Sequence, residues 1–174
     1  MVRNSNKFPK TEFSFQGHRV IFTWIRTSNL LDYQPWTQVY GICFNSKGQI
    51  LIIKEKEWKI PGGTPRKGES PEETLKRELI EEADTVISKC WPLGVQKVDY
   101  PDNPDANMKI FYQYRYVCLI EKLLPQTPDP DNGLVHPRKL IPVKEITRWV
   151  KWGPTGKAMF KDAIELFGEK FLSH

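Results

Sequence analysis

The stretch that decides the fold reads GGTPRKGESPEETLKRELIEEA and occupies residues 62–83. All three of its glycines lie in the first seven residues, where they interrupt regular structure and indicate a loop. Ser70 follows this loop as a candidate N-cap, with Pro71 at the first helical position and Glu73 placed to complete a capping box. We therefore expect a helix over residues 71–83.

Three glutamates lie on one side of this predicted helix. Glu78 and Glu82 are four residues apart, and Glu81 is three residues from Glu78, so the carboxylates meet on one face. At roughly 6 Å and an effective dielectric constant near 20, each pair costs about 2–3 kcal/mol. Arg77 neutralises part of this charge, but a guanidinium approaches from one direction only. A hard divalent cation such as Mg²⁺ suits the carboxylates better, and the glycines allow backbone carbonyls to approach the same ion.

A solvated charged face is the alternative interpretation of each glutamate taken alone. It explains the whole set poorly, because six glutamates fall within 14 residues of a basic chain, with 26 lysines and arginines against 21 acidic residues. A helix with lysines interspersed would be more stable. We therefore expect a function for the set, which comprises Glu69, Glu72, Glu73, Glu78, Glu81 and Glu82.

The same segment resembles the signature of the Nudix hydrolases, which is a glycine, five residues, a glutamate, seven residues, and R-E-U-x-E-E-x-G-U with U aliphatic. Asp84 and Thr85 stand where that pattern has a glycine and an aliphatic residue. Aspartate is a tolerable replacement, because it visits the left-handed conformation that is common just past a helix end. Seven residues match at the required spacings: Gly63, Glu69, Arg77, Glu78, Leu79, Glu81 and Glu82.

The resemblance implies a fold and an activity. The fold is an α+β fold, an α/β/α sandwich with a mixed β-sheet and flanking helices. Chain length and the polar first ten residues predict a single domain over residues 11–174 after a flexible segment at residues 1–10. The activity is Mg²⁺- or Mn²⁺-dependent hydrolysis of a pyrophosphate linkage. Its substrate is a nucleoside diphosphate linked to another moiety, such as a nucleoside triphosphate, ADP-ribose or a nucleotide sugar.

Residue roles are carried over from the family position by position. The metal ligands would be Glu78, Glu81, Glu82 and the carbonyl of Gly62. Arg77 and Glu69 would orient the carboxylates, and Glu82 or Glu81 would take the proton of the attacking water.

Substrate contacts are expected beside the loop. Arg66, Lys67 and Lys54 are candidates for holding phosphates, although ordinary surface charge explains each of them equally well. Five aromatic residues could stack on a nucleobase, with the hydrophobic core as the alternative for each: Trp36, Tyr40, Trp58, Tyr112 and Tyr114. Trp58 is the first of these that we expect to touch the substrate.

A further glutamate, in the loop before the last strand, serves as base or extra ligand in some Nudix hydrolases. If the last strand covers residues 140–143, Lys139 occupies the matching place. The carboxylate is then missing or comes from elsewhere, such as Glu121, Asp102 or Asp105. This departure motivates an alternative function, a catalytically weak or inactive nucleotide-binding module of the same fold.

The rest of the chain supplies the remaining elements. Prolines concentrate between residues 124 and 142 and indicate an irregular loop. Apolar periodicity predicts a helix over residues 157–171 and strands within 12–26, 39–44, 50–54, 85–87, 95–100 and 110–124.

Composition argues against several classes of protein. The longest strongly apolar run is Ile50–Ile53, too short for a transmembrane helix, and no apolar segment follows the first basic residues as in a signal peptide. Three cysteines without C-x-x-C spacing favour free thiols in a reduced compartment and hence a cytoplasmic location. The sequence contains no basic helix, which argues against nucleic-acid binding. We expect the protein to bind a small nucleotide. We expect it to be a monomer or a homodimer.

Overall fold

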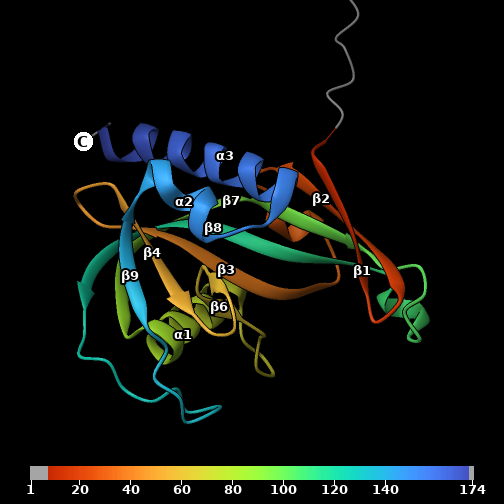
Figure 1. The fold of residues 1–174 in the computed structure, drawn as a ribbon, viewed down its shortest axis with the longest axis horizontal. Coiled ribbons are helices and arrows are strands. Elements are labelled where there is room, and N and C mark those ends of the chain that lie inside the picture. Colours follow the sequence, from red (N-terminus) through yellow and green to blue (C-terminus); the bar gives the residue numbers. More distant parts are fainter. Residues whose placement is uncertain (1–7, 173–174) are drawn as a thin grey trace, which may run out of the picture.

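A computed structural model describes residues 8–172, which form one nine-stranded β-sheet with helices on both faces (Figure 1). The strands are β1 (Lys10–Phe15), β2 (His18–Arg26), β3 (Trp36–Phe44), β4 (Gln49–Lys54), β5 (Trp58–Lys59), β6 (Gly62–Gly63), β7 (Thr85–Asp99), β8 (Ile110–Leu123) and β9 (Arg138–Pro142). The helices are α1 (Pro71–Ala83), α2 (Ile146–Trp149) and α3 (Gly153–Leu172), with short 3₁₀ turns η1 (Leu30–Asp32), η2 (Ala106–Met108) and η3 (Val143–Glu145).

Helix α1 has the predicted bounds and the predicted caps. The Ser70 hydroxyl accepts a hydrogen bond from the Glu73 amide at 3.3 Å, and the Glu73 carboxylate accepts one from the Ser70 amide at 2.8 Å. At the other end, Asp84 adopts the left-handed conformation with φ 44° and ψ 48°. Both ends of the helix are therefore fixed by the local sequence.

The sheet opens between β3 and β4, and this opening positions the glycine turn. The strand order is β1-β2-β7-β8-β3-β4-β5, in which β3 and β8 are parallel. Strands β3 and β4 pair only at Phe44 and Ile50. Beyond that point β6 takes the place beside β3, so that Gly62 pairs with Tyr40, and β9 pairs with β4.

Apolar side chains alternate between two cores, one on each face of the sheet. On β4, Ile50 and Ile52 pack in the core that also holds Phe160 and Phe167 of α3. Leu51 and Ile53, between them in sequence, pack instead in the core that holds Leu75 and Leu79 of α1. Successive side chains of a strand point to opposite faces of the sheet, so both faces of β4 are buried. The expected α/β/α sandwich is confirmed (Figure 1).

Two elements differ from the sequence prediction. Residues 85–87 and 95–100 were expected as separate strands, but β7 runs unbroken over Thr85–Asp99, because its register shifts disturb the alternation without ending the pairing. Helix α3 begins at Gly153 rather than at residue 157. A Gly-Pro pair commonly indicates a turn, but proline also suits the first turn of a helix.

Of the predicted flexible segment, residues 1–7 lie outside the described residues, and Lys10 is the first residue of β1.

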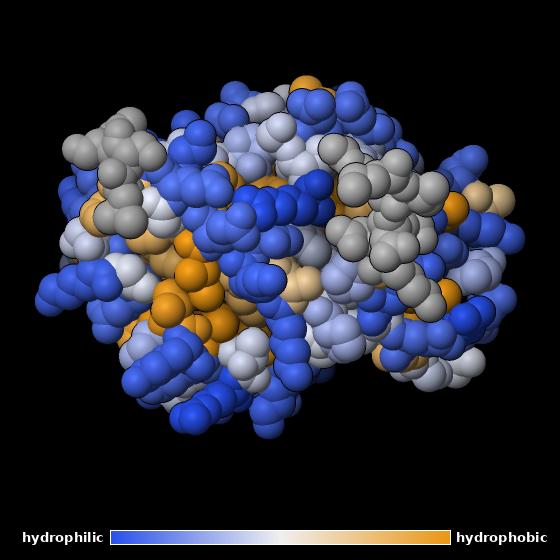
Figure 2. Space-filling view, turned by 90° about the horizontal axis from the view of Figure 1, so that it is seen from above, coloured by the Kyte–Doolittle hydropathy of each residue, from blue (hydrophilic) through white to orange (hydrophobic). Residues whose placement is uncertain are grey.

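The three cysteines are free thiols. None of the helices in the described part of the chain is both long and apolar enough to cross a membrane. The view onto α3 shows a largely hydrophilic face with apolar residues gathered left of its centre and in smaller spots elsewhere (Figure 2).

Candidate active site

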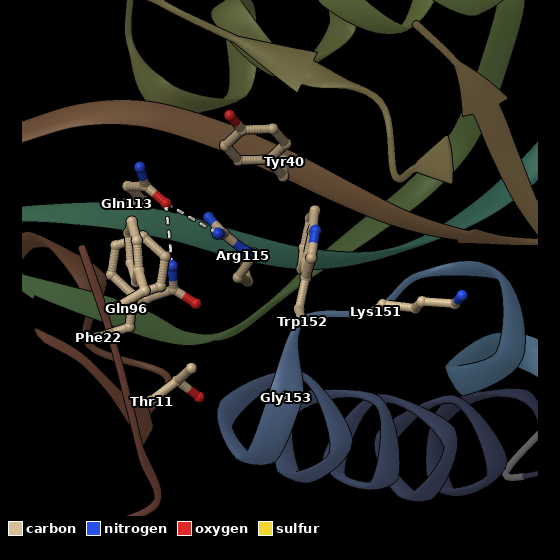
Figure 3. A pocket seen from close by; sticks show the side chains of 10 residues that line it. Thr11, Phe22, Tyr40, Gln96, Gln113, Arg115, Lys151, Trp152 and Gly153 are labelled. Carbon is tan, nitrogen blue, oxygen red and sulfur yellow. Dashed lines mark hydrogen bonds between the residues drawn. The ribbon is translucent and has the colours of Figure 1, made fainter. Parts of the chain in front are cut away.

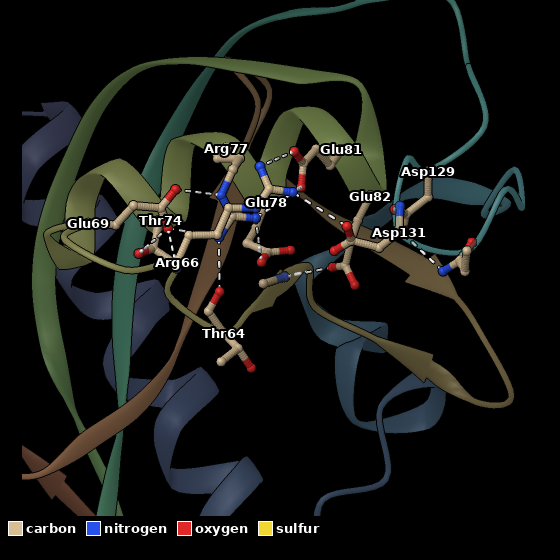
Figure 4. Close-up of polar contacts among 12 residues, drawn as sticks. Thr64, Arg66, Glu69, Thr74, Arg77, Glu78, Glu81, Glu82, Asp129 and Asp131 are labelled. Atoms are coloured by element: carbon tan, nitrogen blue, oxygen red, sulfur yellow. Dashed lines mark hydrogen bonds and ion pairs between the residues drawn. The ribbon is translucent and has the colours of Figure 1, made fainter.

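Arg77 joins helix α1 to the turn that precedes it. Its Nε donates to Glu69 Oε1 at 2.7 Å, and its Nη2 donates to Glu69 Oε2 at 2.9 Å and to the Thr64 carbonyl at 2.9 Å. Its Nη1 donates to Glu78 Oε1 at 2.8 Å and to Glu81 Oε2 at 2.9 Å (Figure 4). These bonds use every donor of the guanidinium. Its bonds to Glu69, together with hydrogen bonds from the Arg66 amide and the Thr74 hydroxyl, lower the pKa of that carboxyl to about 2.

Glu82 is a buried carboxylate that is held by a backbone amide and a lysine. Its Oε2 accepts the Gly62 amide at 2.8 Å, and its Oε1 accepts the Lys59 ammonium at 2.9 Å. Lys59 also pairs with Glu55 at 2.7 Å. Burial raises the pKa of Glu82 to about 7, even though Lys59 and the Gly62 amide oppose the shift. Burial likewise raises the pKa of Glu78.

Both glycines of β6 are required by contacts that a side chain would block. A Cβ on Gly63 would lie 2.5 Å from the carboxyl carbon and one oxygen of Glu78. A Cβ on Gly62, whose φ is +151°, would lie 2.6 Å from the Cα of Tyr40. The backbone of β6 therefore approaches the Glu78 carboxylate from one side and β3 from the other.

A loop between β8 and β9 adds carboxylates that the sequence analysis missed. Asp129, Asp131 and Asn132 line the same pocket of about 310 Å³ as Glu78 and Glu82. Two acids shortly before the last strand were the available signal, but only tertiary folding places them opposite α1. We call this the acidic pocket; it is lined by Gln38, Tyr40, Lys59, Gly62, Gly63, Thr64, Arg66, Arg77, Glu78, Glu82, Asp129, Asp131 and Asn132.

That loop is tied to the end of α1. The Asp84 carboxylate accepts the Thr127 amide at 2.9 Å and the Thr127 hydroxyl at 2.7 Å. Arg138 donates to the carbonyls of Ala83 at 2.7 Å and Leu124 at 2.5 Å. The aspartate that replaces the signature glycine thus has its own structural role.

The acidic pocket has a donor set that fits a hard divalent cation. Its acidic ligands are carboxylate oxygens, which Mg²⁺ and Mn²⁺ prefer, and Gly63 leaves backbone rather than side chain beside Glu78. Within residues 8–172, no three acidic, histidine or cysteine side chains converge as a ready-made metal site. The carboxylates are instead turned toward cations of the chain, namely Lys59, Arg66 and Arg77.

Of the predicted phosphate contacts, the structure brings only Arg66 to the acidic pocket. Arg66 pairs with Glu81 at 3.1 Å and with Asp131 at 3.4 Å. Lys67 is exposed and does not line the pocket. Lys54 is exposed as well, with its ammonium 6.0 Å from the centre of the Trp58 ring. Proximity in sequence to the glycine turn was a poor guide, because Lys54 ends β4 and Lys67 lies in the exposed turn before α1.

The predicted stacking residues Trp58 and Tyr112 also lie outside the acidic pocket. Trp58 packs edge-to-face on Trp149 at 5.3 Å, against the core beneath α3. Tyr112 packs on Tyr33 at 5.3 Å, against the core beneath α1. Both follow the core alternative for aromatic residues on strands. Among the five aromatic candidates, Tyr40 is the one that lines the acidic pocket.

The residues considered for an extra carboxylate lie elsewhere too. Lys139 is inside β9, paired with Ile52, and its ammonium lies 5.0 Å from the centre of the Trp149 ring, so it is not a loop residue. The three suggested replacements do not line the acidic pocket. Asp102 pairs with His18, Asp105 caps η2, and Glu121 is exposed on β8.

Comparison with known proteins gives matches over most of the chain. Residues 35–161 match the family model described as the NUDIX domain. Nudix hydrolase 5 of Arabidopsis thaliana is 26% identical over 125 residues, 67% of this chain and 39% of that protein. The 8-oxo-dGTP diphosphatase of Proteus vulgaris is 40% identical over 45 residues, 26% of this chain and 40% of that protein. The chain thus spans about two fifths of the length of these curated relatives.

Solved structures share the fold at low sequence identity. The Bacillus subtilis pyrophosphohydrolase BsRppH superimposes with a TM-score of 0.56 and 22% identity, over 94% of this chain and 96% of that one. The NUDIX domain of Shewanella oneidensis NrtR, crystallised with ADP ribose, gives a TM-score of 0.56 and 18% identity, over 80% and 96%.

Proposed function

The chain belongs to the Nudix family, and from this premise we propose that it is a divalent-metal-dependent diphosphate hydrolase. Its substrate would be a nucleoside diphosphate linked to another moiety, cleaved at the pyrophosphate linkage. One observation carries the proposal: Arg77 holds Glu69, Glu78 and Glu81 together beside the glycine turn, at distances of 2.7–2.9 Å. This network shapes the acidic face of α1 before any substrate binds.

We assign Glu78, Glu81, Glu82 and the Gly62 carbonyl as the residues that would hold Mg²⁺ or Mn²⁺. When bound, such an ion neutralises phosphate charge and lowers the pKa of a water molecule to near neutrality. Arg77 and Glu69 keep the carboxylates in place, because Arg77 fixes one oxygen of each neighbouring acid. Arg66 supplies a positive charge at the rim of the acidic pocket for the phosphates.

Glu82 is our candidate for the group that takes the proton of the attacking water. Both carboxylates are paired within the chain, Glu81 with Arg66 and Arg77 and Glu82 with Lys59 and the Gly62 amide. Of the two, Glu82 is the one that lines the acidic pocket. Asp131, 66% exposed in its side chain and paired only weakly with Arg66 at 3.4 Å, is our candidate for the additional loop carboxylate. A proton acceptor must lie within hydrogen-bonding reach of the water that it activates.

The alternative of an inactive binding module loses the two features that motivated it. Asp84 adopts the left-handed conformation that the signature glycine would adopt. Lys139 does not occupy the loop position, and Asp129 and Asp131 lie in that loop instead. Neither feature therefore supports a loss of turnover.

The test is a hydrolysis panel on the full chain with Mg²⁺ and with Mn²⁺. Nucleoside triphosphates, dinucleotides, capped nucleotides and nucleotide sugars are compared for the wild type and Glu82→Gln. Glu165→Gln, on α3 at the opposite face of the sheet, is the matched control. We expect metal-dependent turnover of at least one class, reduced a hundredfold or more in Glu82→Gln and unchanged in the control. Equal turnover by all three proteins, or no turnover of any compound, would contradict the proposal.

A further inference from the structure

A second cavity, of about 460 Å³, lies between the sheet and the start of α3 (Figure 3). Its volume is in the range of small-molecule sites. Tyr40 lines both this cavity and the acidic pocket, so the two spaces share one wall. We call it the arginine cavity; it is lined by Thr11, Phe13, Phe22, Tyr40, Gln96, Gln113, Arg115, Lys151, Trp152 and Gly153.

Arg115 is the unusual residue of this cavity, because it is buried without an acidic partner. Its side chain is 1% exposed. Its Nη1 donates to the Tyr114 carbonyl at 3.1 Å and its Nη2 to Gln113 Oε1 at 3.0 Å, but its Nε has no hydrogen-bond partner. No carboxylate in the described residues forms an ion pair with it.

Aromatic rings flank the guanidinium but leave its charge uncompensated. The guanidinium carbon lies 4.4 Å from the centre of the Tyr40 ring and 5.9 Å from that of Trp152, and the two rings also contact each other edge to face (Figure 3). Cation–π contacts of this kind offset part of the cost of burial, yet a buried charge is normally paired. Burial lowers the pKa of Arg115 to about 10, which leaves it charged at neutral pH.

The rest of the lining agrees with an anionic ligand. Among the described residues that line the arginine cavity, the charged ones are Arg115 and Lys151, and none is acidic. Gln96 and Gln113 are hydrogen-bonded to each other at 3.3 Å and supply amides beside the guanidinium. Phe22 and Trp152 supply flat apolar walls. A ring or sugar that bears a negative charge matches this combination of groups.

We propose that the arginine cavity binds one of the two moieties joined by the substrate's diphosphate, and that Arg115 selects a moiety carrying a phosphate or carboxylate of its own. This rests on the proposed function, and Tyr40, which lines both spaces, places the arginine cavity next to the acidic pocket. The substrate class becomes a nucleoside diphosphate linked to an anionic group. A merely structural Arg115 would give no such preference.

The test measures binding by calorimetry without divalent metal, on the full chain, so that it does not depend on hydrolysis. Two pairs of probes differ by one anionic group: UDP-glucose against UDP-glucuronate for a carboxylate, and ADP-ribose against ADP-ribose 1″-phosphate for a phosphate. Arg115→Met removes the charge and keeps an apolar side chain of similar length. Arg148→Met, at an exposed position of α2, removes one charge elsewhere and is the control.

We expect the wild type and Arg148→Met to bind the charged member of at least one pair ten times or more tightly than the neutral member. The pair that shows the preference identifies the anion. In Arg115→Met the two members should bind with affinities within twofold of each other. Equal affinities in the wild type, no binding of any probe, or a preference that persists in Arg115→Met would overturn the proposal.

A second readout covers the case in which Arg115→Met does not fold. The Nε–H signal of Arg115 in nitrogen-15 NMR, assigned with Arg115→Lys, should shift with the charged probe and not with its neutral partner. An unshifted signal would count against the proposal. If no compound of the panel above is hydrolysed but the binding preference is present, the result counts against the proposed function alone. If a compound is hydrolysed but the binding preference is absent, the result counts against the role of Arg115 alone.

Discussion

Replacing Gly63 with alanine tests the contact on which the acidic pocket depends. The added Cβ would lie 2.5 Å from the Glu78 carboxylate, and ordinary van der Waals contact begins near 3.4 Å. Glu78 must therefore move by about 0.9 Å or the β6 backbone must shift by a similar distance. Because β6 is paired with β3 at this point, we expect the side chain to give way.

The displacement has two measurable costs. The bond between Arg77 and Glu78, now 2.8 Å with both side chains less than 15% exposed, would lengthen beyond hydrogen-bonding distance. A hydrogen bond to a charged group contributes about 1.5–3 kcal/mol, so Gly63→Ala should lose about 2 kcal/mol of unfolding free energy. A catalytic group misplaced by about 1 Å can cost about a hundredfold in rate, and we expect a loss of that order in kcat/KM.

Urea denaturation and the hydrolysis assay measure these two effects separately. Gly168→Ala is the matched control, because Gly168 lies in α3 and an added Cβ there would meet nothing within 4 Å. There alanine should stabilise the protein by about 0.5–1 kcal/mol and leave kcat/KM unchanged. If Gly63→Ala keeps both the stability and the kcat/KM of the wild type, Glu78 does not need the close approach of the glycine backbone.

Three further substitutions address the network around α1. Arg77→Lys loses the five-donor fork, so we expect about 3 kcal/mol or more of destabilisation in urea together with reduced turnover, and wild-type values would refute the role of the fork. Asp84→Gly relieves the left-handed backbone, which stabilises the variant by about 1 kcal/mol, but it loses both hydrogen bonds to Thr127. We expect a net destabilisation of about 1–2 kcal/mol. A gain in stability would contradict a structural role for these two bonds. The pKa of Glu69 is lowered to about 2 in the folded protein, so its stabilisation is present above pH 4.5 and is lost as pH falls toward 2; the stability difference between wild type and Glu69→Gln should shrink over that range, and a difference independent of pH would refute the pairing.

Local signals in the sequence were sufficient for α1 and its ends. The capping residues Ser70 and Glu73 and the left-handed Asp84 act within a few residues of the helix, so their geometry could be predicted without a fold. The spacing of Glu78, Glu81 and Glu82 likewise depends only on the pitch of a helix. These features placed the acidic face correctly in the sandwich.

Groups that depend on distant pairing could not be predicted in this way. Arg115 lies in the middle of a largely apolar strand. Its lack of an acidic partner is visible only once β8 lies beside β3 and Trp152 reaches the same face. Asp131 enters the acidic pocket from a loop whose path is set by Thr127 and Arg138. The contact of Trp58 with Trp149 could not be predicted for a related reason, because it depends on where α2, much later in the chain, packs.

The most direct measurement is the binding of Mn²⁺ followed by electron paramagnetic resonance of the free ion, with a non-hydrolysable diphosphate analogue present. We expect the wild type and Glu165→Gln to take up Mn²⁺ with equal affinity, and Glu78→Gln and Glu82→Gln to bind it at least tenfold more weakly. Uptake that is unaffected by both of these glutamine substitutions, or absent from the wild type, would contradict the central claim that the acidic face of α1 binds the catalytic metal.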